Sequence, residues 1–325
     1  MEKKIITITG AAGNIAYSLI FRILSGNIFP ENTKIQLNLL DIKDALPVLK
    51  GVKYEIEDCA FPNLDNIIIT DSSELAFTDS DYILLVGAKP RSKGMQRADL
   101  LLDNANIFQK HAAIINQCVS SDTKIIVVGN PANTNALIVQ NFVTNIPSKN
   151  ITSLMKLDQN RAKSILSNKL NISVSQISQL VVWGNHSATQ FPDLNHSLVS
   201  NNDAPIKSLD QKWIEDAFIP RVQKRGAEII EHRGKSSAAS AASAIYDHLY
   251  ILVNGSKDWE SMGVMMENTY GINDEIFFSF PLQVLDSNID IINGLDVSEV
   301  SMKYIKDSEK ELLMERDIIK EILKG

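Results

Sequence analysis

The segment KKIITITGAAGNIA, residues 3–16, joins an apolar run to a turn with two glycines and the start of an amphipathic stretch. Its β-branched residues indicate a strand, and Gly10 and Gly13 follow where a helix would begin. Backbone N–H groups at a helix N-terminus attract a pyrophosphate, and glycine lets the phosphate approach without a Cβ in the way. Ala16, at the third position of this fingerprint, still permits close packing of helix on strand. The segment therefore predicts a dinucleotide-binding turn.

Outward from this segment, the first half of the chain alternates short apolar runs with amphipathic stretches. Runs bounded by turn or charge signals predict strands buried on both faces, at residues 3–9, 34–41, 66–70, 81–87, 124–130 and 151–155. Helical patterns lie between them, at residues 13–25, 46–60, 97–118 and 132–144. This alternation predicts an α/β fold built on a doubly wound parallel sheet with right-handed crossovers.

The second half has a different rhythm. Helical patterns recur at residues 157–169, 211–232, 237–253 and 297–323, with strand-like runs at residues 177–183, 261–266 and 276–285. The change falls just after the turn-rich sequence PSKN, residues 147–150. We therefore expect a nucleotide-binding domain over residues 1–153, followed by an α+β domain over residues 154–325.

Composition narrows the class of protein. The 325 residues are 44% hydrophobic and 22% charged, which is typical of a globular protein of two domains. The net charge of −7 disfavours nucleic acid as a partner, because such binding needs a basic face. Cys59 and Cys118 stand far apart without clustered histidines, so neither a disulfide framework nor a metal site is expected. Without a signal segment or an apolar run of about eighteen residues, we expect a cytoplasmic location and no membrane contact.

An acidic residue, Asp41, ends the second predicted strand. A carboxylate there accepts hydrogen bonds from the adenosine ribose hydroxyls and repels a 2′-phosphate, so it favours NAD over NADP. The alternative is that Asp41 only ends a strand. Two rival classes lack their motifs: no tyrosine has a lysine four residues later, as short-chain dehydrogenases require, and no GxxxxGK[ST] phosphate loop occurs.

Basic residues are concentrated in GAKPRSKGMQRADLLLDNANIF, residues 87–108, between the fourth strand and a long helix. Ligands bind at this edge of a doubly wound sheet. Such a segment could be an ordinary solvated loop. Arg91 and Arg97 nevertheless suit a lid that closes on a carboxylate, because a planar guanidinium pairs with both carboxylate oxygens.

Several motifs give the chain an end-to-end resemblance to one family. KPRSKGMQRADLL, VGNPANTN, LDQNRA and WGNHSATQFPD are similar to motifs of the NAD-dependent malate dehydrogenases in the lactate/malate dehydrogenase superfamily. TGAAGNIA, EDCAFP, RGKSSAASAASAIYDH, ESMGV and YGI resemble its cytosolic-type branch. The resemblance implies a Rossmann-type NAD-binding domain followed by a substrate-binding and catalytic α+β domain.

The resemblance also implies roles for residues of the second half. His186 would exchange the hydroxyl proton, and imidazole suits this because its reference pKa lies near neutrality. Asp158 would hydrogen-bond the other ring nitrogen and fix the tautomer. The alternative is that Asp158 is only an acidic residue at the start of a helix, where the helix dipole favours it. Arg161, three residues further on, would bind the carboxylate next to the reacting carbon.

In the first half, the resemblance gives Arg97 the role of polarising the substrate carbonyl oxygen and Arg91 that of pairing with the distal carboxylate. Only Arg91 separates a dicarboxylate from a lactate-type substrate, since an uncharged methyl would leave its charge unpaired. Asn130 would bind substrate. Ser240 would reach the nicotinamide, although close helix packing is an equal explanation of its small-residue helix. The residues expected to contact NAD are Gly10, Ala11, Ala12, Gly13, Asn14, Ile15, Ala16, Asp41, Asn104, His111, Val128, Gly129 and Asn130.

Three positions depart from the family pattern, since Asn14 and His111 stand where glutamine is usual and Ala16 stands where glycine is often found. Taken together, the sequence predicts a malate dehydrogenase of the tricarboxylic acid cycle that uses NAD, acts on malate and oxaloacetate, and forms a homodimer. Two alternatives stay open: another NAD-dependent 2-hydroxy acid dehydrogenase of lactate type, and a module that binds NAD without catalysis.

Overall fold

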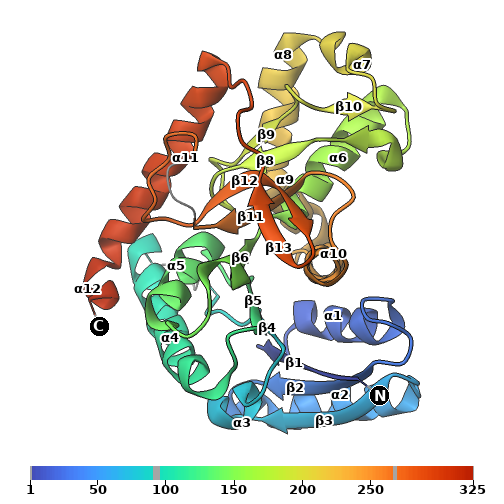
Figure 1. Ribbon diagram of the computed structural model, residues 1–325, viewed down its shortest axis with the longest axis vertical. Coiled ribbons are helices and arrows are strands. Elements are labelled where there is room, and N and C mark those ends of the chain that lie inside the picture. The colour runs from blue at the N-terminus through green and yellow to red at the C-terminus, as the bar shows by residue number, and fades with distance from the viewer. Residues whose placement is uncertain (1, 91–95, 266–268, 325) are drawn as a thin grey trace. The chain divides into compact units, whose positions relative to one another are not determined.

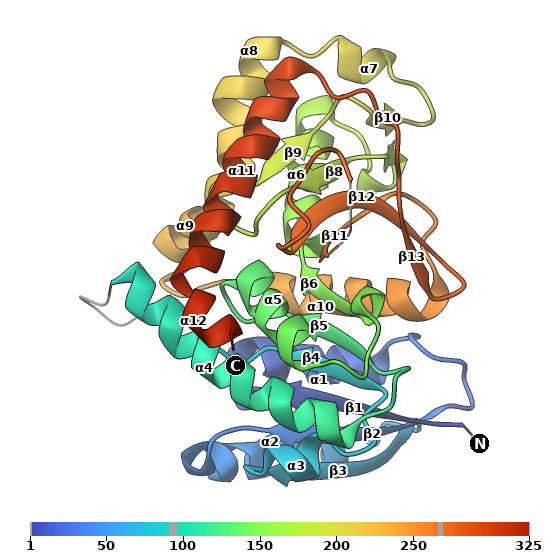
Figure 2. The ribbon, with the colours of Figure 1, turned by 60° about the vertical axis from the view of Figure 1, so that its left-hand side comes forward.

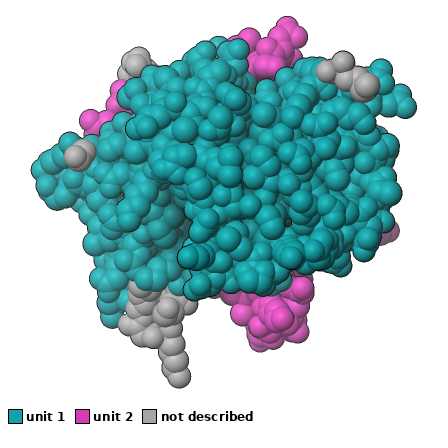
Figure 3. Space-filling model, turned by 90° about the horizontal axis from the view of Figure 1, so that it is seen from below, with its two compact units in different colours: residues 1–153, 314–325 teal, residues 154–313 magenta. Residues whose placement is uncertain are grey.

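The computed structural model describes residues 2–90, 96–265 and 269–324, and the side chain of Arg97 also lies outside the description. Two compact units divide the chain (Figure 3): residues 1–153 with 314–325, and residues 154–313. The sequence placed residues 314–325 in the second domain. They belong with the first unit because Thr134 donates a hydrogen bond to Glu315 and Asn141 donates one to the Leu323 carbonyl.

The described part of the first unit contains a parallel sheet with strand order β3-β2-β1-β4-β5-β6 (Figure 1). Chain order reverses between β1 and β4, as in doubly wound folds that bind ligands at that point of the carboxyl edge. The strands are β1 (Lys3–Thr9), β2 (Lys34–Leu40), β3 (Leu64–Thr70), β4 (Tyr82–Leu85), β5 (Lys124–Val127) and β6 (Ile151–Leu154). Each was predicted, because strands covered on both faces are nearly continuous apolar runs.

Helices connect these strands, and α3, α4 and α5 pack in a row (Figure 2). The bounds are α1 (Asn14–Ser25), η1 (Lys43–Ala45), α2 (Leu46–Asp58), α3 (Ser73–Phe77), α4 (Arg97–Cys118), α5 (Ala132–Phe142), η2 (Ser148–Asn150) and α12 (Lys320–Leu323). Only the short α3 and the 3₁₀ turns had no predicted counterpart. In the described residues, none of the helices is long and apolar enough to cross a membrane.

The second unit combines helices with short antiparallel pairs. Its helices are α6 (Lys156–Leu170), η3 (Val174–Gln176), α7 (Ala204–Lys207), α8 (Gln211–Trp213), η4 (Ile214–Phe218), α9 (Ile219–Arg233), α10 (Ala239–Asn254) and α11 (Glu299–Ile318). Its strands are β7 (Ile177–Ser178), β8 (Val181–Trp183), β9 (Phe191–Asp193), β10 (Leu198–Val199), β11 (Glu260–Val264), β12 (Phe278–Leu285) and β13 (Asn288–Ile291). Antiparallel ladders join β11 to β12 and β12 to β13, so the expectation of an α+β unit is confirmed.

Close backbone packing explains where β4 ends. The predicted strand ran to residue 87, but the ladder stops at Leu85, and the Gly87 N–H donates to Thr9 Oγ1 at 3.1 Å. A Cβ built on Gly10 would lie 2.5 Å from the Gly87 Cα, and Gly10 has a φ of +62°. The turn after β1 therefore needs glycine for two reasons, the left-handed backbone and the approach of the neighbouring strand end.

We expect Gly10→Ala to lower the free energy of unfolding by about 1–3 kcal/mol, because the new Cβ must displace backbone and adopt a strained φ. Gly51→Ala is the matched control, since Gly51 lies in α2 with nothing within 4 Å of a built Cβ. That change should raise stability by about 0.5–1 kcal/mol, the usual gain of alanine over glycine in a helix. Urea unfolding of both variants measures this, and a Gly10→Ala protein as stable as the wild type would contradict the packing argument.

Candidate active site

The turn after β1 presents uncapped backbone N–H groups to solvent. Helix α1 begins after Gly13 without a side-chain cap, and Gly13 and Asn14 are exposed. Free N–H groups at a helix N-terminus bind anions, and the missing Cβ of Gly10 and Gly13 leaves room beside them. The residues present therefore fit the pyrophosphate of a dinucleotide.

Asp41 lies directly after β2 and is tied to this turn. Its carboxylate accepts hydrogen bonds from the backbone N–H groups of Ala12, at 2.9 Å, and Ile42, at 2.8 Å. The side chain thus fixes the turn that the sequence assigned to the phosphates. Of the other turn residues, Ala11 and Ala16 are fully buried, and Ile15 is partly exposed.

The remaining predicted cofactor residues lie on the same edge or along α4. The N–H groups of Val128 and Gly129 both donate to the Leu85 carbonyl at 3.0 Å, and Asn130 is exposed. Asn104 is fully buried; its Oδ1 accepts from the Lys89 N–H at 2.7 Å and its Nδ2 donates to the Leu100 carbonyl at 3.1 Å. The Asn104 amide therefore holds the backbone at Lys89, two residues before Arg91.

His111 lies on α4, with its ring edge-on to Phe77 of α3 at 5.4 Å between centroids. Its Nδ1 lies 3.4 Å from Ser73 Oγ. Burial lowers the pKa of His111 to about 4, so the imidazole is neutral at physiological pH. Of the predicted substrate residues, Arg91 and the side chain of Arg97 lie outside the described residues.

The second unit brings together the two groups predicted to move a proton. Asp158, in the first turn of α6, accepts a hydrogen bond from His186 Nδ1, and its side chain is fully buried. Burial alone would raise the pKa of Asp158, but the charges of His186 and Arg161 and hydrogen bonds from His186 and Gln190 outweigh it and hold that pKa below its usual value. An ionised Asp158 keeps the proton on Nδ1, which leaves the lone pair of the ring on Nε2.

Arg161 shares the carboxylate, since its Nη1 donates to Asp158 Oδ1 at 3.2 Å across one helical turn. Its Nε is buried and has no hydrogen-bond partner among the described residues. The guanidinium lines a cavity of about 420 Å³ that lies within the second unit. The cavity is lined by Leu157, Asn160, Arg161, Ser164, Arg225, Ile229, Ser240 and Ser243. Two guanidinium groups and three hydroxyls make this cavity suitable for an anion such as a carboxylate.

Arg225 and Ser243 in this lining were missed from the sequence. Arg225 donates to Glu228 at 2.7 Å, an i,i+3 pair that reads in the sequence as a solvated helix face. Nothing in the sequence around α9 distinguishes this arginine from its neighbours. Ser240, by contrast, was considered from its small-residue helix, and it lines the cavity with Arg161.

A buried network fixes the start of α6. Lys156 pairs with Glu260 and also donates to Gln159 Oε1 at 3.1 Å, while Gln159 Nε2 donates to the carbonyls of Leu180 and Trp259, each at 2.9 Å. Burial raises the pKa of Glu260 despite the nearby Lys156. The first turn of α6, which carries Asp158 and Arg161, is therefore anchored from several directions. Among the residues described, no group of three or more histidine, cysteine or acidic side chains could hold a metal ion.

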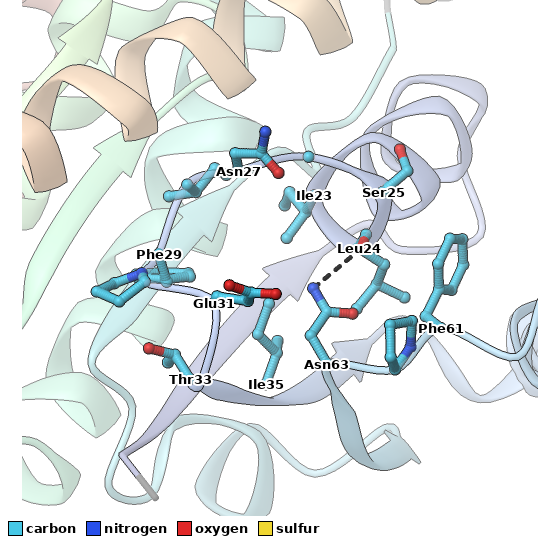
Figure 4. A pocket seen from close by; sticks show the side chains of 14 residues that line it. Ile23, Leu24, Ser25, Asn27, Phe29, Glu31, Thr33, Ile35, Phe61 and Asn63 are labelled. Carbon is cyan, nitrogen blue, oxygen red and sulfur yellow. Dashed lines mark hydrogen bonds between the residues drawn. The ribbon is translucent and has the colours of Figure 1, made fainter.

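A second cavity, of about 620 Å³, lies in the first unit near the start of β2 and β3 (Figure 4). Thr33 and Asn63 line it, and Asn63 donates to the Leu24 carbonyl at 3.0 Å. Both residues precede strands, whereas Gly10, Asp41 and Gly87 follow strands. In a parallel sheet these are opposite edges, so this cavity is not the cofactor site.

Comparison with known proteins gives matches along almost the whole chain. Residues 4–152 match the lactate/malate dehydrogenase NAD binding domain, and residues 155–323 match the lactate/malate dehydrogenase alpha/beta C-terminal domain. The chain is 41% identical to a malate dehydrogenase from Naegleria fowleri, with a TM-score of 0.95 and 99% of each chain covered. It is 33% identical to a Trichomonas vaginalis lactate dehydrogenase solved in complex with NADH and oxamate, with a TM-score of 0.93 and 99% of each chain covered.

An apo form of the Trichomonas vaginalis lactate dehydrogenase with one leucine replaced by arginine is 34% identical, with a TM-score of 0.94. That match covers 100% of this chain and 99% of the other. Solved structures of a malate dehydrogenase and of a lactate dehydrogenase are therefore both similar to this chain in sequence and in fold.

Proposed function

The chain belongs to the lactate/malate dehydrogenase family of NAD-dependent oxidoreductases, and we propose that within this family it interconverts (S)-malate and oxaloacetate. The observation that carries the reaction type is the hydrogen bond between His186 and the buried Asp158, next to the anion cavity of Arg161. When bound, NAD accepts a hydride from the substrate carbon and returns it in the reverse direction.

In the proposed reaction, His186 Nε2 takes the hydroxyl proton of malate and gives it back when oxaloacetate is reduced. Asp158 holds the ring through Nδ1 and stabilises the imidazolium that forms, because its carboxylate is ionised and shielded from water. Arg161, which lines the cavity, binds the carboxylate next to the reacting carbon.

We assign Arg97 to the carbonyl oxygen, where negative charge develops, and Arg91 to the distal carboxylate, both from the sequence. Asn130 is assigned to the substrate as well. Asp41 would accept the ribose hydroxyls of NAD, and Asn104 and His111 stay predictions as NAD contacts. A cytoplasmic location and a place in the tricarboxylic acid cycle also stay predictions.

A lactate-type reaction is the second candidate, favoured by the 33% identity to a lactate dehydrogenase. The His186, Asp158 and Arg161 arrangement would serve either substrate, since it meets only the shared 2-hydroxy acid group. Arg91 is the residue that favours the dicarboxylate, because a buried guanidinium without a partner carries a large desolvation cost.

The reaction is tested by initial rates of NADH and NADPH oxidation with oxaloacetate, pyruvate and other 2-oxo acids. We expect the highest kcat/KM with oxaloacetate and NADH. His186→Asn should lower kcat by about 10²–10⁴-fold, the usual contribution of general acid–base catalysis. The control is His232→Asn, which changes an exposed histidine on α9.

Faster reduction of pyruvate than of oxaloacetate would replace malate by lactate in the assignment. If NADH bound but no 2-oxo acid were reduced, the chain would be an NAD-binding module without catalysis.

The choice of substrate is tested by Arg91→Gln. Because a carboxylate would lose its charged partner, we expect kcat/KM with oxaloacetate to fall by at least about 100-fold, or ~2.7 kcal/mol. The rate with pyruvate should rise relative to that with oxaloacetate. Lys93→Gln, which removes another cation of the same segment, should change the rates with oxaloacetate and pyruvate by no more than about twofold, since the proposal gives Lys93 no contact with the substrate. An unchanged oxaloacetate rate in Arg91→Gln would remove Arg91 from the site.

We propose a homodimer, as expected from the resemblance. Large apolar side chains are exposed on helices of both units, including Tyr17, Val48 and Tyr54 on α1 and α2, and Tyr250 on α10. A dimer would bury such side chains where they lie together in one apolar patch.

Light scattering after size exclusion should give twice the chain mass of 36.1 kDa. Val48→Glu should shift the protein toward the monomer, because it places a charge in the apolar surface of α2. Leu75→Glu, at an equally exposed leucine on α3, should leave the mass unchanged. A wild-type mass near 36.1 kDa would contradict the dimer.

A further inference from the structure

We propose that Glu311, on α11, is a positioning residue that holds the loop carrying His186 so that its ring meets Asp158. The proposal rests on the proposed function, in which His186 exchanges the proton. It concerns a carboxylate more than a hundred residues from His186 in sequence.

One oxygen of Glu311 accepts hydrogen bonds from polar side chains on both sides of His186. Oε2 accepts hydrogen bonds from Asn185 Nδ2 at 3.1 Å, from Thr189 Oγ1 at 2.7 Å, and from Ser187 Oγ. All three donors lie within three residues of the histidine. Because an ionised carboxylate only accepts, it can hold three donors without a competing proton of its own.

A neighbouring residue of α11, Ser308, completes the attachment. The Asn185 N–H donates to Ser308 Oγ at 2.7 Å, and Ser308 Oγ lies 3.0 Å from Thr189 Oγ1. A Cβ built on Gly184 would lie 2.1 Å from this hydroxyl oxygen, and Gly184 has a φ of +96°. The loop is therefore packed against α11 as closely as a glycine allows.

The loop is also closed on itself. Thr189 N–H donates to Ser187 Oγ at 3.0 Å, and Gln190 Nε2 donates to the Ser187 carbonyl at 3.0 Å. The Ser187 hydroxyl thus has a defined direction, since its oxygen accepts from the Thr189 N–H and its proton is donated to Glu311. The ordered donors converge on Glu311, so this carboxylate sets where residues 185–189 lie.

The consequence for catalysis is geometric. A loop position shifted by a fraction of an ångström would lengthen the hydrogen bond between His186 and Asp158, and proton exchange depends strongly on such alignment. Glu311 is not expected to touch substrate, so its loss should affect the chemical step and leave the binding steps unchanged. That separation distinguishes positioning from a role in substrate binding.

The test is Glu311→Gln, which keeps the shape and removes the charge. With whichever of oxaloacetate and pyruvate the wild type reduces, kcat should fall about tenfold, while the KM for the acid and the Kd for NADH stay within about twofold. A hydrogen bond to a charged acceptor is stronger than one to a neutral amide, so the loop should be held less firmly in Glu311→Gln. Asp307→Asn, at an exposed acid of the same helix, is the matched control and should leave kcat unchanged.

A double-mutant cycle tests whether Glu311 affects kcat through the loop of residues 185–189. Thr189→Val removes one donor to Glu311, so the loss in the double variant with Glu311→Gln should be smaller than the sum of the single losses. Additive losses, or a Glu311→Gln protein with the kcat of the wild type, would overturn the proposal. So would a loss that appears in KM in place of kcat.

A readout without substrate separates this proposal from the proposed function. In protein held at pH 8.5, ¹⁵N resonances of the histidine ring report the tautomer, and His186 is assigned by comparison with His186→Asn. We expect the wild type to hold the proton on Nδ1 and Glu311→Gln to show a mixture of tautomers. If the two spectra agree, the loop is held without Glu311; if they differ while no acid is reduced, only the proposed function falls.

Discussion

Asp158 has none of its side chain exposed and is nevertheless held in the charged form. Removing a carboxylate from water costs several kcal/mol, and the cost is offset only by well-placed partners. The protein supplies them from two directions, with Arg161 one helical turn away and His186 from the loop after β8. The positions of α6 and of that loop are therefore coupled, because a displacement of either would leave a buried charge without its partner.

The packing around these two elements follows from the same constraint. Helix α6 begins where Lys156, Glu260 and Gln159 satisfy one another, so the turn that carries Asp158 has little freedom. The loop after β8 is bound to α11 and cannot accept a Cβ at Gly184. Buried polar groups of this kind stabilise the fold only when each has a partner. A rigid arrangement is what proton exchange needs, since the ring must meet carboxylate and substrate at once.

The sequence was most informative where a residue's role depends on its neighbours in the chain. Strands buried on both faces gave apolar runs, and WGNHS with LDQNR placed His186 and Asp158 together. The short β9, β10 and β13 were not predicted, because a run of two to four residues is too short to show a strand pattern and becomes a strand only by pairing with another strand. The helix predicted over residues 211–232 contains a π-helical turn at Ile214–Phe218, which its periodicity did not reveal. Arg225 and Glu311 were missed because the cavity that Arg225 lines and the loop that Glu311 binds form only by tertiary packing, and each looks in the sequence like a solvated helix residue.

In the proposed reaction, the groups of the second unit would bind what all 2-hydroxy acids share, a carboxylate and a carbon whose hydroxyl group gives up a proton. Arg161, Arg225 and the serines of the cavity contain no feature that tests the far end of a substrate. In the proposed reaction that test falls to a single cation from the basic segment of the first unit. Reaction type and substrate choice then rest on different residues, so one can change without the other. A family arranged in this way can contain malate and lactate enzymes at similar sequence distance, as the relatives of this chain do.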